Sequence, residues 1–342
     1  MKKYIPPIAC ILALSMLICT AAIVCENKRD RLEKEKYQTT QTTVPQTTVP
    51  QTMVPPQTTA GTPTTSDDVS LPTIVVPSEL SVSAEHAFLY DVGTDSLIWN
   101  KGDLDDRLYP ASVTKLWTVL VALNYLLPDT PVSVGDEVSL IAADSSKAGI
   151  KKGMRTSVEG LIYAMLLPSG NDAAYALAAA CGRAIVGQDD LSGRRAVDVF
   201  VERMNEHAAR EGLTGSHFTN PDGYHDNDHY TTLADMIKIA KMSVESELMV
   251  RICSTSAVDL KVESGEKLSL KNSNLLVNEN SKYYLPEAIG LKTGHTKRAG
   301  YCLVSAARID GRLIITAVFD SESVFSRFDD ATVLFDAVKD QD

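Results

Sequence analysis

The sequence has too little positive charge and too few long apolar runs for two broad classes of protein. Its 342 residues carry 33 Lys and Arg against 44 Asp and Glu, which gives a net charge of −11. Such a chain lacks the basic surface that nucleic-acid phosphates require, so we expect no nucleic-acid partner. The mean hydropathy of −0.05 excludes a membrane protein with many spans, although it allows a single one.

Cysteine is also scarce, and no two cysteines have the CxxC spacing. Three of the six lie within the first 25 residues, which leaves Cys181, Cys253 and Cys302 in the rest of the chain. An odd number without CxxC pairs argues against a disulfide framework and against a zinc site. We therefore expect no metal.

The N-terminus contains the one long apolar stretch. Residues 4–25 have no charged side chain and come directly after Lys2 and Lys3, as in an export signal or a signal anchor. The triplet at 20–22 suits signal cleavage, but the apolar run continues past it, so we favour an uncleaved anchor. The basic residues just after it would themselves prefer the cytoplasmic side. We predict a signal peptide or anchor at 1–25, and hence an extracytoplasmic protein held on the membrane or secreted.

Residues 26–79 differ sharply in composition from residues 80–342. The pentapeptide Gln-Thr-Thr-Val-Pro occurs at 41–45 and again at 46–50, and positions 38–77 contain no Lys or Arg. A segment with so little apolar bulk cannot offset the entropy of ordering. Regular prolines favour an extended chain of about 3.1 Å per residue. We predict a disordered stalk that holds a domain away from a membrane; an incidental disordered tail is the alternative.

Residues 80–342 are predicted to form one domain of mixed class, α+β or α/β in the broad sense. Alternating strands around a turn at 91–95 indicate a first hairpin, and Asp310-Gly311 suits the turn of a last one. The middle is mostly helical in pattern, and a final amphipathic helix is expected near 324–338. We therefore expect the N- and C-terminal strands to pair antiparallel under a cover of helices.

A first candidate site is Ser112-Val-Thr-Lys115, at the start of an apolar helical pattern. Positions i and i+3 are neighbours on a helix, so the Lys115 amine should lie beside the Ser112 hydroxyl. A serine nucleophile needs an adjacent base, and a desolvated lysine can supply it. Taken alone, the motif is better explained by an ordinary serine cap with a solvated lysine.

Two further motifs lie later in the chain. Ser169-Gly-Asn171 lies between two helical patterns, the first of which we expect to start at a capping box formed by Thr156 and Glu159. Lys292-Thr293-Gly294 lies on a strand, where the glycine leaves room for a ligand. Taken alone, turn chemistry explains the serine motif, and a plain strand edge explains the lysine motif.

In combination, the three motifs form the set of the penicillin-recognising serine enzymes. The sequence resembles the D-alanyl-D-alanine carboxypeptidases of peptidase family S11, the low-molecular-weight penicillin-binding proteins. The resemblance runs from about residue 84 to 342 and rests on six segments: Tyr109–Lys115, Leu167–Ala174, Phe218–Gly223, His229–Asp235, Asn272–Leu276 and Gly290–Thr296. It implies a β-lactamase/transpeptidase-like fold, with a five-stranded antiparallel sheet flanked by helices and an all-helical lobe.

The resemblance also implies roles for individual residues. Ser112 would be the nucleophile, Lys115 its base and Ser169 a proton relay. Asn171, Lys292, Thr293 and Gly294 would bind the substrate, and the backbone N–H groups of Ser112 and His295 would form the oxyanion hole. The substrate would be a peptidoglycan stem pentapeptide that loses its terminal D-Ala, and β-lactams would inhibit covalently. Serine acyl transfer requires no cofactor.

Other interpretations remain open. A β-lactamase or a D,D-transpeptidase could use the same acyl-enzyme, although no Glu-x-x-Leu-Asn occurs after Ser169 to deacylate penicillin. A catalytically inert penicillin-binding sensor is the non-enzyme alternative. His225 and His229 with nearby aspartates could be read as a metal cluster, but we favour a polar surface loop for both histidines.

Overall fold

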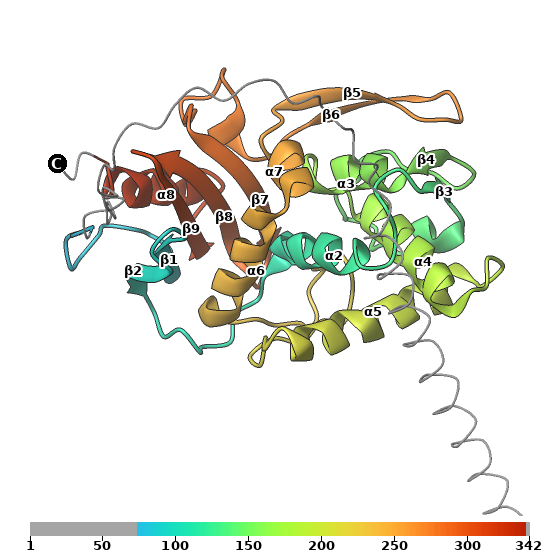
Figure 1. The fold of residues 1–342 in the computed structure, drawn as a ribbon, viewed down its shortest axis with the longest axis horizontal. Coiled ribbons are helices and arrows are strands. Elements are labelled where there is room, and N and C mark those ends of the chain that lie inside the picture. The colour runs from blue at the N-terminus through green and yellow to red at the C-terminus, as the bar shows by residue number, and fades with distance from the viewer. Residues whose placement is uncertain (1–73, 340–342) are drawn as a thin grey trace, which may run out of the picture. The chain divides into compact units, whose positions relative to one another are not determined.

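The computed structural model describes residues 74–339, so the signal or anchor at 1–25 and nearly all of the stalk at 26–79 lie outside the described part. The two predicted hairpins are present, and together with one more strand they form a single antiparallel sheet of order β2-β1-β9-β8-β7 (Figure 1). Its strands are β1 (His86–Asp91), β2 (Ser96–Lys101), β7 (Ala288–Thr296), β8 (Gly300–Ile309) and β9 (Arg312–Ser321).

The predicted pairing of the N- and C-terminal strands is confirmed. Strand β1 pairs antiparallel with β9, from His86 opposite Phe319 to Asp91 opposite Ile314. A buried ion pair between Asp91 and Arg312, 2.8 Å apart, fixes one end of this contact. The chain thus closes its sheet with strands from both ends, which places the helical middle on one side of the molecule.

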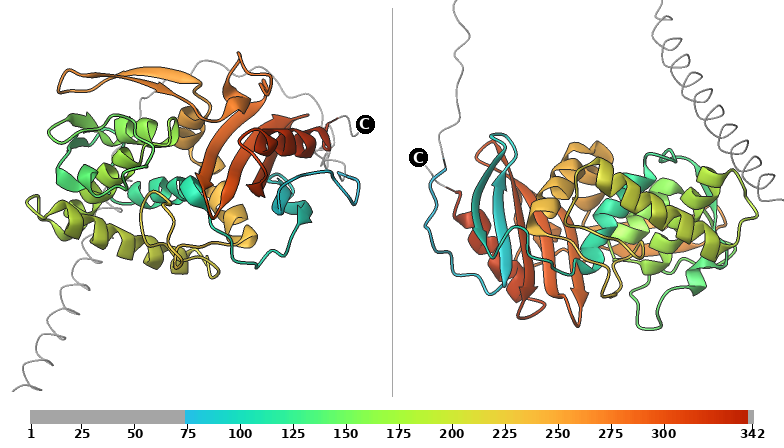
Figure 2. Two further views of the ribbon diagram at one scale, coloured as in Figure 1. Left: turned by 180° about the vertical axis from the view of Figure 1, so that it is seen from behind. Right: turned by 90° about the horizontal axis from the view of Figure 1, so that it is seen from below.

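The predicted last helix is α8 (Ser326–Asp336), which packs on one face of the sheet (Figure 2). Buried Phe328, Leu334 and Phe335 meet Leu89 and Val318 in one apolar cluster there. The helix begins later than the pattern suggested. Val324 and Phe325 precede it and are 39% and 55% exposed, so they are not part of its apolar face.

The helical lobe lies against the other face of the sheet (Figures 1 and 2). Helix α2 is central to the fold because it contacts α3, α4, α5 and α6 as well as β7. The helices are α2 (Thr114–Ala122), α3 (Val158–Leu166), α4 (Asn171–Val186), α5 (Gly193–Arg210), α6 (Leu233–Glu245) and α7 (Glu247–Cys253), with short 3-10 turns η1 (Ala111–Val113), η2 (Asp136–Ser139) and η3 (Leu275–Val277).

The prediction of an all-helical lobe was incomplete. The middle of the chain also contains two small antiparallel sheets, one of β3 (Pro131–Ser133) with β4 (Arg155–Ser157) and one of β5 (Ala257–Lys261) with β6 (Lys267–Lys271). The capping box was wrong by one residue. Ser157, and not Thr156, caps α3 by accepting a hydrogen bond from the Gly160 N–H, so the helix begins one residue later than the capping box predicted.

Within residues 74–339, no helix is both long and apolar enough to cross a membrane. The three cysteines of this range, Cys181, Cys253 and Cys302, are free and buried. Burial raises the pKa of the Cys181 thiol, and it raises the pKa values of Cys253 and Cys302 to about 12. These thiols are packed as small apolar groups and are poor nucleophiles.

Candidate active site

The predicted contact between serine and lysine is present. The Lys115 Nζ and Ser112 Oγ atoms are 2.8 Å apart. Ser112 lies in the 3-10 turn η1 and not at the start of the α-helix as predicted, since α2 begins only at Thr114. The residue before the serine, Ala111, has a φ of +48°. Strained backbone of this kind persists only where the surrounding structure imposes the backbone conformation, and it is common at functional sites.

Lys115 is completely buried, and it has two more polar neighbours. Its Nζ donates to Asn171 Oδ1 at 2.8 Å and to the Asp222 carbonyl at 2.7 Å. Burial lowers the pKa of Lys115 to about 8, against the opposite effect of the negative charges of Asp222 and Asp172. A neutral amine is therefore accessible near neutral pH, and it lies within hydrogen-bond distance of the hydroxyl that needs a base.

Asp222 is a site residue that the motifs did not identify. Its carbonyl is brought to Lys115 by Gly223, which has a φ of +78°. A Cβ atom at Gly223 would lie 1.8 Å from the Ala111 carbonyl oxygen, so only glycine permits this approach. The Asp222 carboxyl is 1% exposed, its Oδ2 has no hydrogen-bond partner, and burial raises its pKa although Lys115 opposes this. The turn-forming Asn-Pro-Asp-Gly at 220–223 was the available signal.

Asn171 is placed at the site as predicted, at the start of α4. Its Oδ1 faces Lys115, and its Nδ2 donates to Ser145 Oγ at 3.0 Å. The same helix start holds the neighbouring loop, because the buried Asp172 carboxylate accepts hydrogen bonds from the backbone N–H groups of residues 148, 149 and 150. This loop carries Ser145, so Asn171 connects it to Lys115.

Ser169 lies on the predicted tight connection between α3 and α4, with a φ of +64°. Its carbonyl accepts a hydrogen bond from Ser146 Oγ at 2.6 Å. Within residues 74–339 its hydroxyl makes no hydrogen bond to Lys115 or Ser112. The structure therefore places Ser169 on the loop that meets the site, and its role as a proton relay stays a prediction.

Lys292 and Thr293 lie on β7 and are both buried. The Lys292 Nζ donates to the Thr293 carbonyl at 2.9 Å, and the Thr293 hydroxyl shares a hydrogen bond with Ser273 at 2.7 Å. Burial lowers the pKa of Lys292 well below its ordinary value, and the positive charges of Lys115 and Arg327 lower it further. A substrate carboxylate beside Lys292 would raise its pKa again, because the negative charge favours the ammonium form.

Arg327, on α8, is a second cation behind this strand that sequence reasoning missed. Its Nη1 donates to the Gly294 carbonyl at 3.2 Å, while its buried Nε has no hydrogen-bond partner. Nothing in the local sequence marks it, because it comes from a terminal helix 33 residues beyond Gly294 and reaches the strand only in the folded sheet.

Gly294 brings β7 against Ser112. A Cβ atom there would lie 3.0 Å from the Pro110 carbonyl and 3.2 Å from the Ser112 nitrogen. The strand backbone therefore passes next to the backbone N–H of Ser112, and His295 is the next residue along the strand. The two N–H groups predicted for an oxyanion hole thus come from elements in contact.

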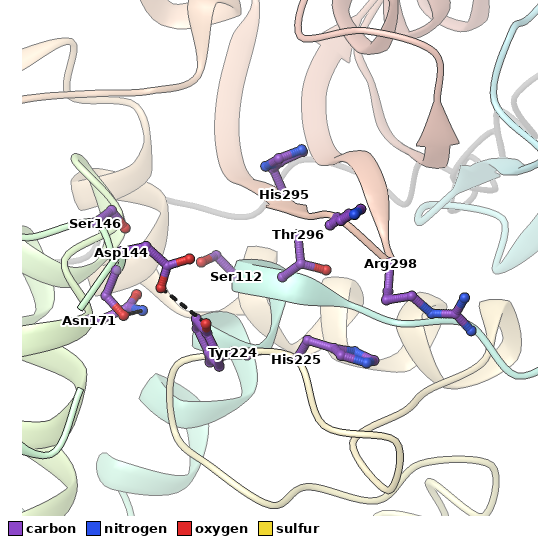
Figure 3. A pocket seen from close by; sticks show the side chains of 12 residues that line it. Ser112, Asp144, Ser146, Asn171, Tyr224, His225, His295, Thr296 and Arg298 are labelled. Carbon is purple, nitrogen blue, oxygen red and sulfur yellow. Dashed lines mark hydrogen bonds between the residues drawn. The ribbon is translucent and has the colours of Figure 1, made fainter. Parts of the chain in front are cut away.

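A pocket of about 490 Å³ opens at Ser112 (Figure 3). It extends from Ser112 and Asn171 to loops on both sides. Its remaining lining comes from Asp144, Ser145, Ser146, Gly223, Tyr224, His225, His295, Thr296, Lys297 and Arg298. Its volume is in the range of small-molecule sites. Ser112 lines the pocket, whereas Lys115 and Lys292 are buried and do not line it.

The expectation of a surface loop for both histidines was wrong for His229. Its side chain is 2% exposed, shares a 2.8 Å hydrogen bond with the Thr114 hydroxyl and accepts one from the Thr219 N–H. Burial lowers the pKa of His229 to about 3, so it is neutral. Its hydrogen bonds tie the loop that contains Asp222 to the first residue of α2. His225 is only partly buried and lines the pocket.

A serine with a buried lysine at hydrogen-bond distance, beside a Lys-Thr-Gly strand of an antiparallel sheet, defines a serine acyl-transfer enzyme of the penicillin-recognising class. The comparison with known families agrees. The sequence model of peptidase family S11, D-alanyl-D-alanine carboxypeptidase, matches residues 73–323. The chain belongs to this family of serine peptidases.

Individual relatives are similar over most of the chain. The D-alanyl-D-alanine carboxypeptidase DacF of Bacillus subtilis is 30% identical over 76% of this chain and 63% of its own length. The D-alanyl-D-alanine carboxypeptidase of Streptomyces sp. strain K15 is 32% identical over 74% of this chain and 86% of its own length. The chain thus spans somewhat less than two thirds of the Bacillus relative.

Solved structures show the same fold. The S96A mutant of the Streptomyces K15 DD-transpeptidase superposes with a TM-score of 0.68 at 30% identity, over 76% of this chain and 98% of that one. Penicillin-binding protein D2 from Listeria monocytogenes, solved in the ampicillin-bound form, gives 0.61 at 24% identity, over 76% and 99%. The β-lactamase/transpeptidase-like fold predicted from the motifs is confirmed.

Proposed function

We propose that this chain removes the terminal D-Ala from peptidoglycan stem pentapeptides through an acyl-enzyme on Ser112. The observation that carries the proposal is the 2.8 Å contact between the Ser112 hydroxyl and a buried lysine whose pKa is lowered to about 8. Family membership and the names of the relatives support the substrate class.

Acylation begins when neutral Lys115 takes the proton of Ser112. The Ser112 oxygen attacks the carbonyl between the two terminal D-alanines, and the developing oxyanion accepts hydrogen bonds from the Ser112 and His295 N–H groups. Ser169 relays this proton from Lys115 to the nitrogen of the leaving D-Ala as the peptide C–N bond breaks. Water then hydrolyses the ester, which frees the shortened peptide and restores Ser112 and Lys115. The step uses only protein groups and water.

The substrate is held on both sides of the attacked bond. Lys292 and Thr293 bind the terminal carboxylate, and Arg327 adds positive potential behind the strand. On the acyl side, Asn171 Nδ2 donates a hydrogen bond to a substrate carbonyl. This carbonyl replaces the Ser145 hydroxyl, to which Nδ2 donates in the structure. Binding of the carboxylate raises the pKa of Lys292, so the peptide binds together with a proton when Lys292 is neutral.

The same groups would react with β-lactams, whose strained amide and carboxylate resemble the terminal dipeptide. We propose that such compounds acylate Ser112 and remain attached. The ampicillin-bound Listeria structure supports this by fold alone.

The test is product analysis. Wild-type protein incubated with a stem pentapeptide should release D-Ala and a tetrapeptide, and Ser112→Ala should release neither. A product joined to an added amine would indicate a transpeptidase, and rapid turnover of penicillin would indicate a β-lactamase. An intact, folded protein that neither cleaves peptide nor binds penicillin covalently would contradict the proposal and favour an inert module.

We also propose that the enzyme works outside the cytoplasm, held on the membrane by residues 1–25. The uncharged stretch after Lys2 and Lys3 and the site's peptidoglycan substrate support this. Cell fractionation tests it. Protein recovered in the soluble cytoplasmic fraction would contradict it.

A further inference from the structure

The pocket at Ser112 carries charges that the proposed mechanism does not use. Asp144, Lys297 and Arg298 all line it. Figure 3 shows Asp144 and Arg298 on opposite sides of Ser112. In the part of the chain that the structure describes, none of the three is within salt-bridge distance of an opposite charge. Both sides are therefore open to a charged ligand.

Asp144 is held in place by a tyrosine from a distant loop. The Tyr224 hydroxyl donates to Asp144 Oδ1 at 3.0 Å, across 80 positions of sequence (Figure 3). This hydrogen bond raises the pKa of the Tyr224 phenol, which therefore remains the donor. Among residues 74–339, the second carboxylate oxygen of Asp144 has no hydrogen-bond partner. The carboxylate is thus oriented while one oxygen stays available.

The direction of strand β7 determines the direction in which a substrate peptide would bind along it. Strand β7 is the last in the sheet order, and Lys292 precedes His295 along it. An extended peptide that adds antiparallel to β7 with its carboxylate at Lys292 has its earlier residues beside residues 295–298. Neither Lys292 nor Thr293 lines the pocket, whereas residues 295–298 do. The pocket is therefore on the acyl side, where the third residue of the stem peptide lies.

The third residue can extend into the pocket that Asp144 lines. Neighbouring Cα atoms are about 3.8 Å apart, so this residue lies directly next to the attacked D-Ala, and a pocket of about 490 Å³ accepts a long side chain. A side-chain ammonium is repelled by Lys297 and Arg298 and attracted by Asp144. Resting on the proposed function, we propose that Asp144, oriented by Tyr224, binds the side-chain ammonium of a diamino acid at the third position of the stem peptide.

The test compares pentapeptides L-Ala-γ-D-Glu-X-D-Ala-D-Ala in which X is L-lysine, meso-diaminopimelate or L-norleucine. Norleucine has the carbon chain of lysine without the ammonium. We expect wild-type kcat/KM to be about five- to tenfold higher for the two diamino peptides than for the norleucyl peptide, a value between those of exposed and buried charge pairs. The difference should arise mainly in KM, because the contact is made equally in the ground and transition states.

Three variants separate the contact from other causes. Asp144→Asn keeps the shape and should lower the preference for the diamino peptides to less than about twofold. Tyr224→Phe removes the hydroxyl that orients Asp144 and should give an intermediate preference. Asp129→Asn makes the same charge change at an exposed aspartate outside the pocket, and should keep the wild-type preference. Thermal unfolding of each variant checks that it is folded.

The outcomes are distinct from those that test the proposed function. Equal cleavage of all three peptides by the wild type, or an undiminished preference in Asp144→Asn, would overturn the role of Asp144 while the carboxypeptidase activity stands. Cleavage of no peptide and no covalent penicillin adduct would overturn the proposed function, and this inference with it. A preference that disappears in Asp144→Asn but not in Asp129→Asn would establish the contact.

Discussion

Lys115 and Lys292 are both buried near Ser112, and neither has an ion-pair partner within residues 74–339. Burial disfavours the ammonium form, so it lowers the pKa of both lysines. The two have opposite tasks in the proposed mechanism. Lys115 must be neutral to take a proton, whereas Lys292 must be charged when it holds a carboxylate. Substrate binding meets both requirements, because the substrate carboxylate places a negative charge beside Lys292 and not beside Lys115.

This assignment predicts how the rate of acylation depends on pH. Below the Lys115 pKa of about 8 the amine is protonated and cannot act as a base, so the second-order rate constant should fall about tenfold for each pH unit. It should level off above that pKa. Stopped-flow labelling with a fluorescent penicillin from about pH 6 to about pH 10 measures it. A rate independent of pH over this range would contradict a lysine base.

Replacement of Lys292 tests the carboxylate contact separately from the nucleophile. Lys292→Ala leaves Ser112 and Lys115 in place but removes a charged hydrogen bond of about 1.5–3 kcal/mol, so acylation should slow about 10- to 150-fold. A larger decrease would mean that Lys292 also affects proton transfer. Lys271→Ala, an exposed lysine on β6, is the matched control and should label at the wild-type rate. An unchanged rate in Lys292→Ala would exclude the contact.

At the scale of elements, backbone strain occurs at all three motifs. Among residues 74–339, six residues other than glycine have positive φ, and three of them are Ala111 next to Ser112, Ser169 in the second motif and Leu291 beside Lys292. Strain of this kind costs about 1–3 kcal/mol per residue and persists only where packing imposes it. Here η1 packs against β7, and the start of α4 meets Lys115 through Asn171.

Replacement of Gly294 tests how closely β7 must approach the nucleophile. In Gly294→Ala the new methyl group would be 3.0 Å from the Pro110 carbonyl and 3.2 Å from the Ser112 nitrogen. The strand must move by a few tenths of an ångström, which misplaces the oxyanion donors, and acylation should slow by about tenfold to a hundredfold. Gly93→Ala, whose new Cβ would make only an ordinary 3.4 Å contact, is the control. A Gly294→Ala variant that labels at the wild-type rate would contradict the proposed oxyanion hole.

Features encoded by local spacing could be predicted from the sequence, and contacts made only by folding could not. The Ser112–Lys115 contact is predictable from a three-residue spacing, and the hairpins are predictable from alternation around turns. The carbonyl of Asp222 meets Lys115 through its backbone, which has no side-chain signature. Strands β3 and β4 have three residues each, too few for a visible alternation.

Strands β5 and β6 did have a readable signal. Val258 and Leu260 alternate with polar residues, as do Leu268 and Leu270, and Gly265 lies between the two runs. This is the usual hairpin pattern, and assigning the whole middle of the chain to helices overlooked it. The terminal helix was predicted because its apolar spacing was long enough to distinguish from a strand.

At the scale of the whole molecule, the catalytic domain is held together by its first and last segments. The Asp330 carboxylate of α8 accepts hydrogen bonds from the Ser83 N–H, the Ser83 hydroxyl and the Ala84 N–H. Ile74 and Val76 pack against the same apolar cluster, and the Trp99 indole donates to the Ser78 carbonyl. Residues before 80 therefore contribute contacts to the domain, while every motif lies after it.

Two truncations test the domain boundary. Protein that begins at residue 73 and protein that begins at residue 80 should both fold and label with penicillin, because the site lies entirely beyond 80. The shorter one loses the packing of Ile74 and Val76 and should be less stable by about 1–3 kcal/mol. Urea unfolding measures the difference. If the shorter protein is unfolded or does not label, the domain begins earlier than predicted.

The most direct test of the central claim is the mass of the intact protein after incubation with a penicillin, together with mapping of the adduct. We expect one penicillin to be added per chain, on the peptide that contains Ser112. Ser112→Ala should gain no mass, because no other described group at the site pairs a nucleophile with a buried base. An adduct on another residue, or labelling of Ser112→Ala at the wild-type rate, would contradict Ser112 as the nucleophile.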